Sequence, residues 1–192
     1  ITPMGIPSPH LSGVTENETM AALVGTSGRM DESSATLVPE DTTARKFMAQ
    51  NNKQTFGEMA GEDLSGVTDS EVLDAILYNV FPNFAPWAGF NPNIIYRFRP
   101  NGNDVDSAIM DVMMLYRYPK GTERPEAVPI NRLDDDEPWT NAPELGGLGA
   151  IFEQDMANIP MVQKGMKASK KGAVSLGNYQ EARIRHVHQT LD

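Results

Sequence analysis

The sequence predicts an α+β fold, because segments with helical periodicity bracket a stretch that alternates with a period of two. Apolar residues recur every three to four positions in residues 68–80 and again in residues 145–166. Between them, residues 93–99 and 107–118 alternate in the manner of strands, and the pair Asn101-Gly102 is a strong hairpin signal. Long helices around an antiparallel sheet define the α+β class.

Length and composition narrow the class of protein. The 192 residues suffice for one domain with a sizeable core, and the hydrophobic share of 40% is that of a soluble globular protein. A net charge of −10 argues against nucleic acid and anionic membranes as partners. Without cysteine, these residues cannot form disulfides, thiolate metal sites or an iron–sulfur cluster. No apolar run approaches the roughly 18 residues of a membrane helix, so we expect a cytoplasmic protein.

The first third of the chain changes from loop to helix. Residues 1–39 are rich in Pro, Gly, Ser and Thr and are predicted to be loop, with one short helix near residues 18–24. Residues 40–59 have a helical pattern, and Asp41 or Thr42 is a plausible N-cap for this helix.

The middle of the chain begins with the best-marked helix. It starts at Thr68, where the sequence Thr-Asp-Ser-Glu is a capping box, and Pro82 ends it. The second strand, residues 107–118, has one wholly apolar face and one mixed face, as expected in an antiparallel sheet covered on one side. Residues 120–143 form a long polar connection, for which Trp139 is a candidate anchor.

The helix at residues 145–166 contains a carboxylate, Asp155, in the middle of its apolar stripe. The other members of the stripe are Leu148, Phe152, Ile159, Val162 and Met166. A carboxylate on an apolar face must be neutralised, paired with a cation or bound to a metal, unless it turns to water at the edge of the stripe. Pro160 lacks a backbone N–H, so we expect a kink or break one turn beyond Asp155. These alternatives stay open on the spacing alone.

Three stretches carry a resemblance to a known family: residues 81–84 with 94–100, residues 152–166, and residues 179–192. The central one reads Phe-Glu-Gln-Asp at residues 152–155 and continues to Val-Gln-Lys-Gly-Met at its end. It resembles the catalytic domain of the large (α) subunit of Rieske non-haem iron aromatic-ring-hydroxylating oxygenases. The resemblance implies a helix-grip (START-like) fold, in which a curved antiparallel sheet wraps a long helix over a hydrophobic cavity.

The resemblance also implies a site and a reaction. Asp155 would be the carboxylate of a 2-His-1-carboxylate site for mononuclear non-haem Fe²⁺. Leu148 and Phe152 would line the substrate cavity, although both are equally well explained as core residues. The family cis-dihydroxylates or monooxygenates an aromatic substrate with O₂ and receives electrons through a 2Fe–2S Rieske cluster. The implied partners are a ferredoxin or reductase and other subunits, in a homotrimer or an α/β hetero-oligomer.

The histidines depart from the family pattern. The family's two iron-binding histidines are four or five residues apart in an H-x4-H or H-x5-H motif, whereas this sequence has only His10, His186 and His188. His186 and His188 would point to different sides of a helix. The Rieske motif is absent as well. We therefore expect residues 1–192 to be the C-terminal portion of a single catalytic domain, with the Rieske domain and the histidine segment upstream of Ile1.

Two rival interpretations remain. One is a START-like domain that binds a hydrophobic ligand without catalysis, and upstream histidine and Rieske motifs would distinguish the oxygenase from it. The other is a structural remnant in which Asp155 only forms an ion pair with Lys164, Arg183 or Arg185. The iron content of the full-length protein would distinguish the oxygenase from this remnant. A phosphate-binding loop and a G-x-S-x-G nucleophile motif are both absent from the sequence.

Overall fold

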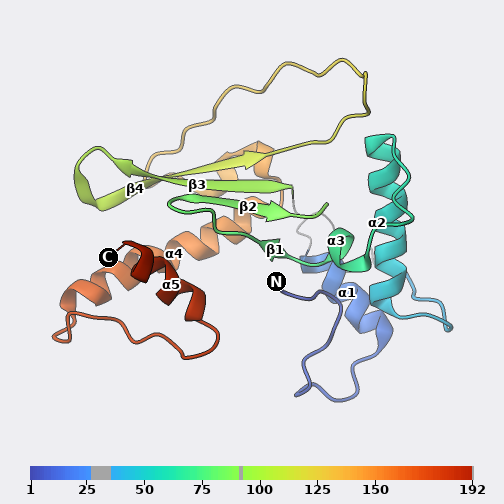
Figure 1. Cartoon of the computed structure of the whole chain (residues 1–192), viewed down its shortest axis with the longest axis horizontal. Coiled ribbons are helices and arrows are strands. Elements are labelled where there is room, and N and C mark those ends of the chain that lie inside the picture. Colours follow the sequence, from blue (N-terminus) through green and yellow to red (C-terminus); the bar gives the residue numbers. More distant parts are fainter. Residues whose placement is uncertain (27–35, 91–92, 192) are drawn as a thin grey trace. The chain divides into compact units, whose positions relative to one another are not determined.

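A computed structural model describes residues 1–26, 36–90 and 93–191 (Figure 1). The helices are α1 (Glu16–Thr26), α2 (Ala44–Ala60), α3 (Asp69–Leu73), α4 (Leu148–Ala168) and α5 (Ala182–Leu191), with short 3-10 turns η2 (Trp139–Asn141) and η3 (Pro143–Leu145). The strands are β1 (Ile76–Leu77), β2 (Phe84–Ala88), β3 (Ile94–Asn101) and β4 (Asp104–Met114). The predicted α+β class is therefore confirmed.

The chain divides into two compact units. The first contains residues 1–132 and 144–146, and the second contains residues 133–143 and 147–192. The first unit therefore holds α1 to α3 and the whole sheet, whereas the second holds η2, α4 and α5. None of the described helices is long and apolar enough to cross a membrane.

The core of the first unit lies among α1, α2 and α3. Its buried members are Met20, Leu23, Val24, Ala44, Ala49, Val72 and Leu73. The N-cap of α2 is Thr43, whose side-chain oxygen accepts a hydrogen bond from the backbone N–H of Lys46 at 3.3 Å. The predicted caps Asp41 and Thr42 are wrong by one or two residues, because both lie in the turn that precedes the helix.

The capping box at Thr68 is confirmed, but its helix is much shorter than predicted. The side-chain oxygen of Thr68 accepts a hydrogen bond from the backbone N–H of Glu71, and the carboxylate of Glu71 accepts one from the backbone N–H of Thr68, as the box requires. The helix nevertheless ends at Leu73, and Asp74 is extended, with φ −76° and ψ 147°. The chain then pairs with partners distant in sequence, because Ala75 bridges Thr2 and β1 pairs with β2. Long-range pairing has overridden the helical pattern of residues 74–80.

The sheet is antiparallel, with the strands in the order β1-β2-β3-β4 (Figure 1). The predicted hairpin joins β3 to β4 and sets Tyr96 opposite Val112. Gly102 in its turn has φ +59°, a conformation that glycine adopts without strain. The sequence pattern did not predict β2, which contains Pro86 and is held by pairing with both neighbours. β4 ends at Met114, four residues before the predicted end.

In the second unit, α4 runs unbroken from Leu148 to Ala168 with Pro160 inside it. Of the kink or break expected at Pro160, the break is therefore wrong, and the kink stays a prediction. A proline removes one hydrogen bond from the helix ladder, and the exposed position of Pro160 lets its ring project into solvent. The helix continues for about two turns beyond it.

Candidate functional site

The three predicted site residues lie in the first two turns of α4, in the second unit. Phe152 is buried, with 5% of its surface exposed, and Leu148 is half-buried. Asp155 is exposed. The remaining apolar members of the stripe are about half exposed: Ile159, Val162 and Met166. The apolar stripe is thus covered at its N-terminal end and open beyond Asp155.

The short turn η2 covers the N-terminal end of α4. The ring of Trp139 stacks on that of Phe152, with 4.9 Å between the centroids and 28° between the planes. The backbone N–H of Trp139 donates a hydrogen bond to Oε2 of Glu153 at 2.8 Å. A Cβ at Gly149 would lie 3.2 Å from the carbonyl oxygen of Trp139 and 3.3 Å from Cα of Thr140, so η2 and α4 approach each other closely at this glycine. Trp139 therefore anchors the polar connection, as predicted.

The carboxylate of Asp155 faces solvent and takes part in none of the ion pairs among the described residues. The ion pair expected for a structural remnant, with Lys164, Arg183 or Arg185, is therefore not formed. Asp155 is thus exposed and forms no ion pair among the described residues, and the alternative in which it binds a metal stays a prediction. An exposed, unpaired carboxylate on a continuous helix is available to a ligand from outside the described residues.

Metal ligands do not gather around Asp155 within the described part of the chain. No group of three or more His, Cys, Asp or Glu residues there could hold a metal ion. His10 is exposed in the N-terminal loop, and His186 and His188 are exposed on α5. A ferrous site needs several protein ligands, and the described residues do not bring such a set together.

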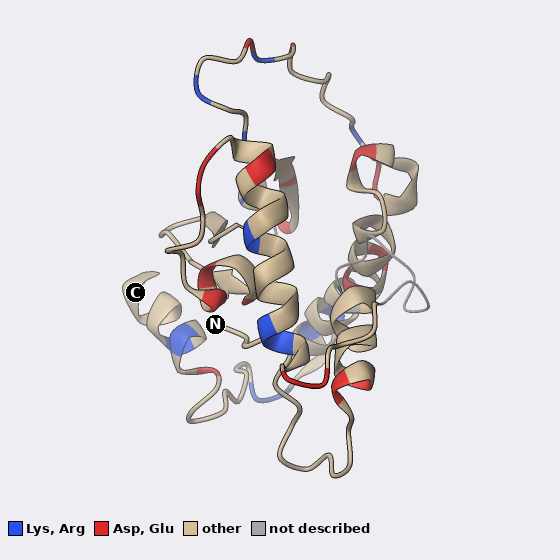
Figure 2. Cartoon of the chain, turned by 90° about the vertical axis from the view of Figure 1, so that its right-hand side faces the viewer, with Lys and Arg blue, Asp and Glu red and all other residues tan. Residues whose placement is uncertain are grey.

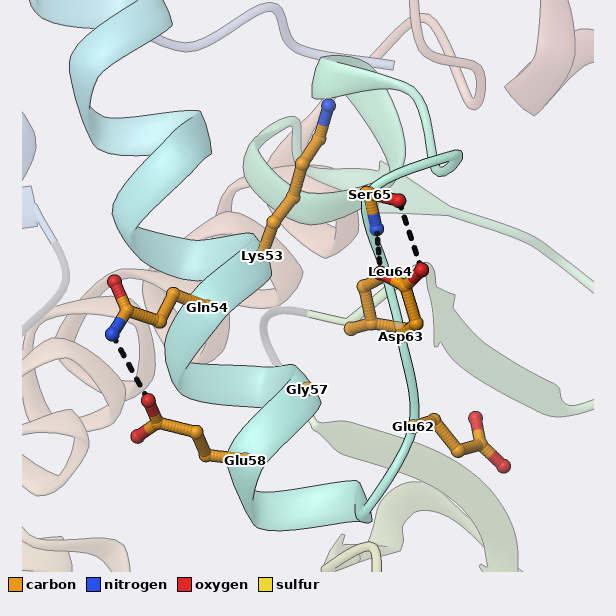
Figure 3. A pocket seen from close by; sticks show the side chains of 8 residues that line it. All are labelled: Lys53, Gln54, Gly57, Glu58, Glu62, Asp63, Leu64 and Ser65. Atoms are coloured by element: carbon orange, nitrogen blue, oxygen red, sulfur yellow. Dashed lines mark hydrogen bonds between the residues drawn. The ribbon is translucent and has the colours of Figure 1, made fainter.

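A groove with a volume of about 340 Å³ lies between α2 and the loop that follows it (Figure 3). Its polar side chains largely satisfy one another. Asp63 accepts hydrogen bonds from the backbone N–H of Ser65 at 2.9 Å and from its Oγ at 3.1 Å. Gln54 donates to Glu58 at 3.0 Å. Basic bands near the start and middle of α2 and an acidic band near its end are visible in Figure 2.

A second groove, of about 190 Å³, lies between the N-terminal segment and α1. Leu148, Phe152 and Asp155 line neither of the two grooves. The predicted site residues share one face of α4, and their position in a substrate cavity stays a prediction.

The sheet carries a charged cluster that the sequence reasoning did not single out. Asp111 accepts hydrogen bonds from Nε of Arg97 at 2.8 Å and from Nε and Nη2 of Arg99 at 2.7 and 3.0 Å. The bonds from Arg99, and then those from Arg97, lower the pKa of Asp111 to about 2, although burial opposes them. The β3–β4 register, which sets Arg97 opposite Asp111, could have indicated this cross-strand ion pair.

Comparison with known proteins assigns the family. A family model described as the ring hydroxylating alpha subunit (catalytic domain) matches residues 7–192. Comparison with curated proteins and with solved structures gives no match. The family match spans nearly the whole chain and includes the Phe-Glu-Gln-Asp run on α4. The chain therefore belongs to the family of ring-hydroxylating α-subunit catalytic domains.

Proposed function

We propose that this chain is part of the catalytic domain of an aromatic-ring-hydroxylating oxygenase. The reaction is cis-dihydroxylation or monooxygenation of an aromatic substrate with O₂, and the electrons arrive from a Rieske 2Fe–2S cluster. The observation that carries the proposal is the family match over residues 7–192, which contains the Phe-Glu-Gln-Asp run. Residues 1–192 are, on this proposal, the C-terminal portion of a single catalytic domain with a helix-grip arrangement.

Asp155 is proposed as the carboxylate ligand of mononuclear non-haem Fe²⁺. Its exposure and its lack of an ion pair among the described residues support this role. The two histidine ligands come from sequence beyond these 192 residues, because His10, His186 and His188 have the wrong spacing. When bound, the iron supplies the capacity to activate O₂. The contribution of this chain is a negative charge held on a continuous helix.

Leu148 and Phe152 are proposed to contact the aromatic substrate. On a helix with about 100° per residue, Leu148 and Phe152 lie within about 60° of Asp155 around the axis. Apolar side chains beside a metal ligand provide the surface that an aromatic ring requires. The ring of Phe152 stacks on that of Trp139, and this contact restricts its orientation. The electron donor is a ferredoxin or reductase, and the subunits form a homotrimer or an α/β hetero-oligomer.

The test is incorporation of ¹⁸O from ¹⁸O₂ into an aromatic substrate by the intact, iron-loaded protein with its electron donor. The proposal predicts labelled diol or phenol from the wild type and none from Asp155→Ala. Gln154→Ala is the matched control, because Gln154 is an exposed neighbour on the same helix, and it should retain labelled product. Substrate binding without labelled product from the wild type would instead identify a START-like ligand-binding domain without catalysis.

A further inference from the structure

The turn η2 contacts one side of α4, in the helical turn immediately before Asp155. These contacts involve Gly149, Phe152 and Glu153 of α4, which lie within about 100° of one another around the helix axis. The ring of Trp139 stacks on Phe152, its backbone N–H donates a hydrogen bond to Glu153, and its carbonyl oxygen lies close to Gly149. A stacked ring, a charge-assisted hydrogen bond and a close backbone approach together resist both rolling and sliding of the helix.

We propose that Trp139 and Glu153 are positioning residues that fix the rotation of α4 about its axis, and thereby the direction in which Asp155 points. Asp155 lies one turn beyond Phe152 on the same continuous helix, so any roll at Phe152 is transmitted to it. The consequence for iron rests on the proposed function, whereas the restriction of rotation does not.

Small rotations matter to a metal ligand. The outer atoms of a helix lie about 5–6 Å from its axis, so a roll of about 20° would move the Asp155 carboxylate by roughly 2 Å. Metal–ligand distances tolerate deviations of only about 0.2 Å. Loss of groups that orient a metal ligand typically weakens metal binding about 10–100-fold. An unrestrained α4 would therefore present Asp155 in the wrong place for most of the time.

The first measurement is the iron dissociation constant of the intact protein, obtained by competition with a chelator. Trp139→Ala should raise this constant about 10–100-fold, and Trp139→Phe, which preserves an aromatic ring against Phe152, should restore most of the affinity. Glu153→Ala, a milder change that removes the acceptor of the Trp139 N–H, should also weaken binding. If Trp139→Ala lowers thermal stability but leaves the iron affinity of the folded protein unchanged, the contact only stabilises the fold and the proposal is wrong.

The second measurement does not depend on iron. In the intact protein, replacing Asp136 and Asp155 with a genetically encoded ketone-bearing residue provides two unique sites for nitroxide labels, both in the second unit. Electron–electron distance measurements should give a narrow distribution when residue 139 is Trp or Phe and a clearly broader one with Trp139→Ala. An equally narrow distribution with Trp139→Ala would refute the positioning role. If Asp155→Ala retains its full iron content, Asp155 is not an iron ligand and the proposed function is wrong. The distances between the labels still test whether Trp139 restricts the rotation of α4.

Discussion

The buried carboxylate of Asp74 should be the most sensitive single position in the first unit. Its side chain is 5% exposed. It accepts hydrogen bonds from Nη1 and Nη2 of Arg45 at 2.5 and 3.0 Å, from Oγ of Ser70 at 2.6 Å and from the backbone N–H of Met4 at 2.9 Å. One carboxylate thus connects the N-terminal segment with α2 and α3. Asp74→Asn removes the charge and keeps the size.

The pKa of Asp74 sets the magnitude of the effect. Burial acts to raise this pKa, but the hydrogen bonds from Arg45, Ser70 and Met4 outweigh it and lower the pKa from 3.8 to about 2. At 1.36 kcal/mol per pH unit, a difference of nearly two units corresponds to about 2–3 kcal/mol of folding free energy at pH 7. The change also leaves Arg45, with a side chain only 21% exposed, without its anionic partner.

The pH dependence has a definite sign. Because the folded-state pKa lies below the unfolded value, the contribution of Asp74 is complete above about pH 4 and is lost as the pH falls toward 2. Urea denaturation of wild type and Asp74→Asn should therefore differ by about 2–3 kcal/mol at pH 7 and converge near pH 2. The sequence has two tryptophans, and only Trp87 lies in the first unit. In a Trp139→Phe background, its fluorescence should report that unit alone.

Asp111→Asn is the matched control. The pKa of Asp111 is also about 2, but its partners Arg97 and Arg99 have side chains 49% and 42% exposed. Solvent screens such pairs, so the control should cost less than about 1 kcal/mol. The reasoning would be refuted by equal losses for the two variants, or by a loss for Asp74→Asn that is the same at pH 7 and pH 2.

Three further predictions concern a cap, a turn and the proposed substrate contact. Thr68→Ala removes the N-cap of α3 and should lower the free energy of unfolding by about 0.5–2 kcal/mol in urea denaturation; an unchanged midpoint would contradict the capping role. Gly89→Ala should destabilise the protein by about 1–3 kcal/mol, because Gly89 has φ +80° and a Cβ would collide with the carbonyl oxygen of Glu71; unchanged thermal unfolding would contradict this. Phe152→Leu in the intact protein should change the product distribution more than the iron content, and identical products from several aromatic substrates would make Phe152 a core residue only.

Local patterns in the sequence predicted those elements that local interactions determine. The capping box at Thr68 needs only residues within one turn, and the Asn101-Gly102 hairpin needs only its own turn chemistry. The end of α3 was missed because it depends on Arg45, Thr2 and β2, which are distant in sequence from Asp74. Helical spacing in residues 74–80 could not reveal these partners.

The candidate site was predictable only where it depends on local sequence. The Phe-Glu-Gln-Asp run located Asp155 on a helix, which the structure confirms. The pattern placed Asp155 on an apolar face and left its surroundings open, because exposure depends on which elements cover that face. Trp139 was identified as an anchor, but its partners Phe152 and Glu153 are 13 and 14 residues away. Contacts at that separation follow from tertiary packing and not from periodicity.

The most direct test of the account is the iron content of the intact protein with and without the Asp155 carboxylate. Wild type and the exposed control Gln154→Ala should each bind one mononuclear iron per catalytic domain besides any iron in a Rieske cluster. Asp155→Ala should lose most of that mononuclear iron, whereas the iron-free forms of wild type and variant should have the same unfolding transition, because the carboxylate lies in solvent. Full retention of the mononuclear iron by folded Asp155→Ala would contradict the central claim that this helix supplies the carboxylate of the iron site.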